Sequence, residues 1–133
     1  SWPPLVYWAG AVGVAVILRF TLLTEVFKFH GAEHKAVNYY QAQSSQQDQL
    51  ADYPRLARRC GTNLIAVYLI LIGLLEYLGL GFNVWLETFL LLGVAYELLL
   101  IMPSRLLAIP FLLQRFTTIE PEPKQLAAAQ TAL

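Results

Sequence analysis

Charged residues are scarce in this chain. Only 14% of its 133 residues are Asp, Glu, Lys or Arg, whereas a typical soluble domain has about 25%. The nine basic and nine acidic residues cancel, so the chain lacks the positive excess that marks nucleic-acid-binding proteins. Cysteine is nearly absent as well, because Cys60 is the only one. These absences exclude a nucleic-acid partner and an internal disulfide.

Hydrophobic residues make up 57% of the chain, and they concentrate in three long runs, 5–24, 64–82 and 84–102. Each run is long enough for a helix to cross the roughly 30 Å hydrocarbon core of a bilayer. The alternative is that the three runs are buried helices of a soluble bundle. Such helices need a polar face, whereas these runs are apolar nearly all round. The first run is too long for a signal-peptide core and is expected to be retained. The sequence therefore predicts an all-α integral membrane protein with three transmembrane helices in a single domain, 1–133.

The basic residues indicate an orientation. All except Arg19 lie in 25–63 or 103–133, and the turn between the second and third runs has none. The positive-inside rule then places the N-terminus outside, and the loop 25–63 and the C-terminus in the cytoplasm, in a bacterial plasma membrane or a thylakoid membrane. Segment 103–116 is apolar but too short to span, so we expect an interfacial segment kinked at Pro110, followed by a short tail.

Two ionisable residues fall inside the predicted spans at similar depth. Arg19 lies near the cytoplasmic end of the first run and Glu97 near that of the third. Charges at membrane depth are costly, so the two are expected to form an ion pair. The alternative is that Arg19 extends to the headgroups and Glu97 is protonated.

The chain's only histidines lie in the stretch "HGAEHK". His30 and His34 are four residues apart, which on a helix puts them on one face. With Glu33 they form the pattern H-x-x-E-H of inverted zincins, in which two imidazoles hold zinc and the carboxylate activates its water. The alternative is an interfacial helix whose histidines and lysines face headgroups and water.

A zinc site of this kind needs a third protein ligand. The candidates are Glu97, if it reaches the cytoplasmic surface, and Cys60, whose thiolate Arg58 and Arg59 would favour. Glu25 and Asp52 are weaker candidates. The two arginines would also attract anionic lipid or an acidic partner.

Four stretches in order, "HGAEHK", "RCGTN", "AYE" and "LQRFTTIEP", resemble an uncharacterised membrane family, the domain of unknown function 1385 or YqhQ-like family. The resemblance runs from about Glu25 to the C-terminus. Its members are commonly described as predicted metal-dependent enzymes, which implies His30, Glu33, His34 and Cys60 as a site. The chain departs from the family in having "LARRCGT" where relatives often have His-Pro-Arg before Cys-Gly-Thr, so a possible third histidine ligand is missing.

Two functions follow from these patterns. The first is a metal-dependent membrane protein, with zinc as the candidate cofactor and hydrolysis as the candidate reaction. The second is an accessory or assembly subunit of a larger membrane complex, a translocon or a photosynthetic assembly, in which ion pairs such as Glu33–Arg59 and Lys35–Glu120 join the loop to the tail. Its partner would dock on the small residues around Gly13. A lipid- or pigment-binding subunit is a third alternative.

Overall fold

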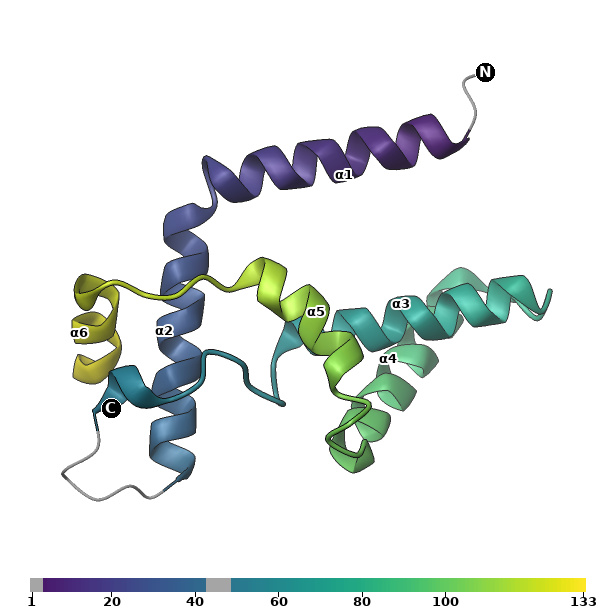
Figure 1. The fold of residues 1–133 in the computed structure, drawn as a ribbon. Coiled ribbons are helices and arrows are strands. Elements are labelled where there is room, and N and C mark those ends of the chain that lie inside the picture. The colour runs from purple at the N-terminus through teal and green to yellow at the C-terminus, as the bar shows by residue number, and fades with distance from the viewer. Residues whose placement is uncertain (1–3, 43–48) are drawn as a thin grey trace. The chain divides into compact units, whose positions relative to one another are not determined.

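The computed structural model describes residues 4–42 and 49–133. Every regular element in these residues is helical, which confirms the all-α prediction (Figure 1). The elements are α1 (Pro4–Phe20), α2 (Thr24–Gln41), the 3-10 helix η1 (Leu50–Asp52), α3 (Gly61–Tyr77), α4 (Val84–Ile101), α5 (Ala108–Thr117) and α6 (Pro123–Thr131). The chain divides into two compact units.

The first unit, Ser1–Arg55 with Phe116–Leu133, contains a sharp bend that the sequence did not predict. The apolar run 5–24 does not form one helix, because α1 ends at Phe20 and α2 leaves it at an angle of 75°. The bend satisfies the last carbonyls of α1: the amide of Leu23 donates to Leu18 O at 2.9 Å, and the hydroxyl of Thr24 donates to Arg19 O at 2.9 Å. The histidine motif therefore begins on a new helix, α2.

The C-terminal segment of the first unit returns to α2. The amide of Ile119 donates to the carbonyl of Phe27 at 3.0 Å. A side chain at Gly31 would place its Cβ 2.2 Å from Ile119 O, much closer than two such atoms can approach. Only glycine allows this contact, so the packing of the C-terminal segment explains why the histidine motif contains a glycine.

The second unit, Leu56–Arg115, is built on the hairpin of α3 and α4. The expected turn lies between them: Gly79 has a φ of 67°, and the side chain of Asn83 accepts from the amides of Trp85 and Leu86 at the start of α4. The core of this unit consists of Val67, Ala95, Leu99 and Leu107. The unit also contains α5, where Pro110 lies in the first turn, a position at which proline is tolerated. The expected kink at Pro110 stays a prediction.

Among the described residues, Val84–Ile101 is the one helix long and apolar enough to cross a membrane by itself. The bent pair Leu5–Phe20 and Thr24–Gln41 passes the same test only when its two helices are taken together, and Gly61–Tyr77 is apolar but shorter. Large apolar side chains on α1 and α4 are nevertheless exposed, including Trp8 at 69% and Phe89 at 74%. Three membrane spans thus remain a prediction.

Candidate metal centre

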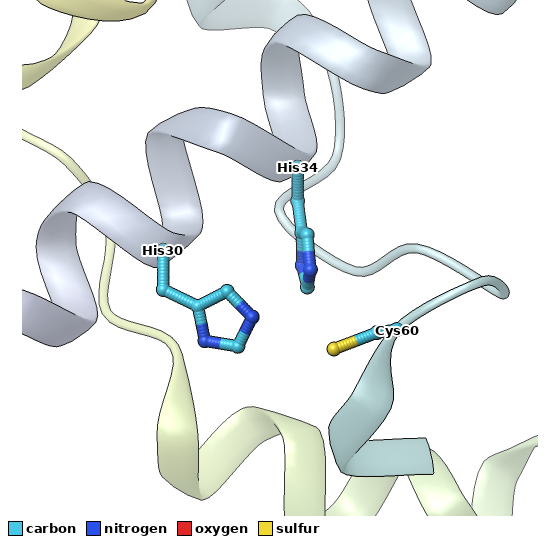
Figure 2. Close-up of side chains that lie close together, drawn as sticks. All are labelled: His30, His34 and Cys60. Atoms are coloured by element: carbon cyan, nitrogen blue, oxygen red, sulfur yellow. The ribbon is translucent and has the colours of Figure 1, made fainter. Parts of the chain in front are cut away.

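The two histidines project from the same face of α2, as their spacing predicts (Figure 2). Their ring centroids are 4.4 Å apart, and the ring planes meet at 64°. His34 is buried, with 5% of its surface exposed, whereas His30 is half-buried. The pair is therefore close enough for both rings to serve one ion.

Both rings are held by backbone carbonyls through the same nitrogen. Nδ1 of His30 lies 2.9 Å from Thr117 O, and Nδ1 of His34 lies 2.8 Å from Arg55 O. A carbonyl oxygen can only accept, so each Nδ1 must be the protonated donor. In a neutral imidazole the lone pair then resides on Nε2. Histidines that bind metal ions characteristically donate their other ring N–H in this way.

Lys35, the last residue of the motif, is a buried lysine with three acceptors. Its ammonium donates to Ala51 O and Tyr53 O at 2.7 Å each, and lies 2.7 Å from Oε1 of Glu120. Only 4% of Lys35 is exposed. The expected pair of Lys35 and Glu120 is thus present, and it joins α2 both to the segment around η1 and to the tail.

Cys60 is buried at the N-cap position of α3, where its Sγ accepts from the amide of Thr62 at 3.4 Å. Together with His30 and His34 it forms a group that could hold a metal ion. Each of the three offers one ligand atom, and these atoms all lie within 4.8 Å of one another (Figure 2). The other candidate for third ligand, Glu97, is exposed on α4 and is not part of this group.

The remaining predicted site residues have other surroundings. Glu33 is exposed and lines a groove of the first unit together with His30. Arg58 donates to the last carbonyls around the end of α4, including Met102 O at 2.8 Å, and Arg59 is exposed. These contacts leave the predicted role of the two arginines in lipid or partner binding untested.

Two further residues that the sequence singled out, Arg19 and Gly13, lie on α1. The guanidinium of Arg19 lies over the rings of Phe20 and Phe116. The expected Arg19–Glu97 ion pair stays a prediction. Gly13 is exposed, and a Cβ added there would meet nothing within 4 Å.

One polar cluster was missed by the sequence reasoning. It joins the starts of α2 and α6 and consists of Glu25, Lys28, Glu122, Lys124 and Gln125; we call it the α2–α6 clasp. Lys124 approaches Glu25 to 2.8 Å, Gln125 donates to Glu25 at 3.0 Å, and Lys28 pairs with both Glu122 and Glu25. The one local signal is the spacing of Glu122 and Gln125, because Gln125 accepts from the Glu122 amide as in a capping box.

Charge pairing in the clasp shifts two pKa values. The hydrogen bond from Lys124, followed by that from Lys28, lowers the pKa of Glu25. The hydrogen bond to Glu122, followed by that to Glu25, raises the pKa of Lys28. Glu25 is thus engaged with α6, and Asp52, the other weak ligand candidate, is exposed in η1. Neither belongs to the metal group.

The chain matches a family model and a curated relative. The family model described as "Protein of unknown function (DUF1385)" matches residues 11–133. The chain is also 32% identical over 136 aligned residues to "Uncharacterized protein YqhQ" of Bacillus subtilis strain 168, an alignment covering 89% of this chain and 42% of the relative. The chain thus spans less than half the length of this relative. No solved structure matches this chain significantly.

Proposed function

Given that the chain belongs to the DUF1385 family of proteins of unknown function, we propose that it is a membrane protein that binds one zinc ion through His30, His34 and Cys60. The observation that carries the proposal is the pair of hydrogen bonds from the two Nδ1 atoms to backbone carbonyls. They fix both rings in the tautomer that presents Nε2 as a ligand.

The third ligand is supported by proximity and by chain connectivity. The Sγ of Cys60 belongs to the group whose ligand atoms lie within 4.8 Å of one another. His34 holds the carbonyl of Arg55, and Cys60 follows Arg55 by about five residues, a distance of at most roughly 18 Å along an extended chain. The ligand atoms of a tetrahedral zinc ion lie about 3.5 Å apart, a spacing within the 4.8 Å limit of this group.

The donor set suits zinc better than magnesium or calcium. Imidazole and thiolate are the ligands that zinc prefers, whereas the hard cations take oxygen. Three protein ligands leave a fourth position for water or substrate, as in catalytic zinc sites, where the bound ion lowers the pKa of water to about 7. We assign Glu33 the role of base, because its exposed carboxylate lines the same groove as His30.

Elemental analysis of the purified chain tests the metal site. We expect about one zinc per chain in the unaltered protein, and a loss of at least tenfold in zinc affinity in His34→Ala or Cys60→Ser. Glu33→Gln is the matched control, because it should keep the zinc and lose only hydrolytic activity. Absence of zinc in a folded, unaltered protein would remove the proposal.

The membrane part of the proposal is that α1, α3 and α4 lie in the bilayer with α2 and α6 at the cytoplasmic surface. It is supported by the exposed apolar side chains of these three helices and by the distribution of basic residues. Single cysteines in a Cys60→Ser background test it in sealed vesicles. A cysteine at Leu80 should react with an impermeant reagent from the outside and one at Gln130 from the cytoplasmic side. The reverse pattern would invert the orientation, and labelling of both from one side would exclude the three-span topology.

A second function, an accessory subunit of a larger membrane complex, is favoured by the surface of α1. Gly10 and Gly13 are exposed, and a Cβ at either would meet nothing within 4 Å. Small residues of this kind let a second helix approach closely in a membrane. Gly13→Leu should then reduce co-purification of the partner, whereas Val12→Leu, on another face of α1, should not. Equal partner recovery with both variants would count against the role.

A further inference from the structure

The first unit contains a groove of about 830 Å³ between α2 and α6. Apolar side chains of α2 form one wall, and the other is formed by Ala128 and Ala129 of α6 with Ala132 and Leu133 after it. The residues that define its shape are Phe29, Val37, Tyr40, Ala128, Ala129 and Ala132. Its volume falls within the roughly 300–1,000 Å³ of small-molecule sites. The alanines of α6 create the space, because any larger side chain there would fill it.

The apolar wall is uncovered. Phe29 is 49% exposed and Tyr40 is 72% exposed, although α6 runs beside α2 (Figure 1). The clasp fixes only the starts of the two helices, through contacts such as Lys124–Glu25. The groove is therefore formed in the structure itself and has room for an apolar ligand.

Among the residues that the structure describes, three with ionisable side chains line this apolar groove, His30, Glu33 and Tyr40, and no lysine or arginine does. A carboxylate without a neighbouring cation in the lining repels an anionic headgroup and tolerates a neutral or zwitterionic one. An extended peptide is a poor fit, since its backbone N–H and C=O groups would find few partners there. An acyl chain has no such groups to satisfy.

We propose that the groove binds the acyl chain of a membrane lipid with a zwitterionic or uncharged headgroup, placing the polar end of the lipid near His30 and Glu33. His30 both lines the groove and belongs to the metal group. The identification of this lipid as the substrate rests on the proposed function, whereas its binding rests on the groove alone. The reactive centre would then receive its substrate from the bilayer.

Photocrosslinking in nanodiscs tests the inference with two probes that carry the same diazirine-labelled acyl chain. One is a zwitterionic phosphatidylethanolamine and the other an anionic phosphatidylglycerol. Mass spectrometry should locate adducts in 26–40 and 128–133, several-fold more abundant with the zwitterionic probe. Glu33→Lys should reverse this preference, because it replaces the carboxylate of the groove by a cation.

The control variants differ only in which face of α6 they alter. Ala129→Phe fills the groove and should reduce these adducts several-fold, whereas Ala127→Phe, exposed and outside the lining, should leave them unchanged. Adducts equally abundant in both variants, or found only on α1, α3 and α4, would overturn the inference. Crosslinking of the groove to a protein in place of lipid would overturn it as well.

Zinc analysis of the same samples separates this inference from the proposed function. Zinc without groove adducts would overturn lipid binding and leave the metal site standing. Groove adducts in a protein without zinc would support lipid binding and remove the metal site.

Discussion

Lys35 lies 2.7 Å from Glu120, and this ion pair ties the helix that carries both histidines to the segment between α5 and α6. The same ammonium donates to the carbonyls of Ala51 and Tyr53. A single buried cation thus joins three stretches that are distant in sequence. Its contacts hold in place the backbone around Arg55 and Thr117, whose carbonyls orient His34 and His30.

Removing the ammonium of Lys35 should lower the free energy of unfolding more than removing the carboxylate of Glu120. Lys35→Met leaves two carbonyls without their donor, and we expect the free energy of unfolding to fall by about 2–4 kcal/mol. Glu120→Gln should cost at most about 1 kcal/mol, because the Glu120 side chain is 61% exposed and solvent screens the pair. Unfolding of both variants in detergent, followed by circular dichroism, measures the difference. Equal losses would show that the ion pair, and not the two carbonyls, is the main contact of Lys35.

Gly31 should tolerate no side chain. Gly31→Ala places a Cβ 2.2 Å from the carbonyl oxygen of Ile119, and backbone must shift to relieve the clash. We expect a loss of about 1–3 kcal/mol, although alanine is the better helix former by about 1 kcal/mol. Gly13→Ala is the matched control, because it has open space and should not destabilise the protein. If both variants were equally stable, the tail would not pack on α2 as described.

Acid should release α6 from α2. The lowered pKa of Glu25 means that its contribution to stability is present above its ordinary value of 4.5 and is lost as the pH falls through the lowered pKa. The raised pKa of Lys28 has the opposite sign: its contribution is present below 10.5 and is lost as the pH rises through the raised pKa. The clasp should therefore hold between these limits and loosen outside them.

Spin labels on cysteines introduced at Gln41 and Gln130, in a Cys60→Ser background, measure this release. The distance distribution should be narrow near pH 7 and should broaden as the pH is lowered stepwise below 4.5. Glu25→Gln should broaden it already at neutral pH and remove most of the acid transition. A distribution that does not change with pH in either protein would show that the clasp does not hold α6.

The local patterns of the sequence predicted much of the site. The spacing of His30 and His34 gave their common face, since the period of a helix decides it. The pair of Lys35 and Glu120 was predicted from their opposite charges and from the expected return of the tail. Of the two residues considered as third ligand, Cys60 belongs to the group with the histidines and Glu97 does not.

Long-range features could not be predicted in the same way. Gly31 has to be glycine because the carbonyl oxygen of Ile119 lies close to it. This contact joins residues that are distant in the chain, so no local pattern of the sequence predicts it. The bend after Phe20 could not be predicted, because Leu22 and Leu23 continue the apolar run through it. The tautomers of the histidines likewise depend on backbone carbonyls of distant residues. Every residue has such a carbonyl, so the sequence does not indicate which ones accept from the two rings.

X-ray absorption at the zinc edge tests the central claim most directly, because it counts the atoms bound to the ion. We predict two imidazole nitrogens at about 2.0–2.1 Å and one sulfur at about 2.3 Å, with the sulfur replaced by a lighter atom in Cys60→Ser. A zinc ion surrounded only by oxygen and nitrogen in the unaltered protein would contradict the assignment of Cys60. A folded protein that binds no zinc would contradict the site as a whole.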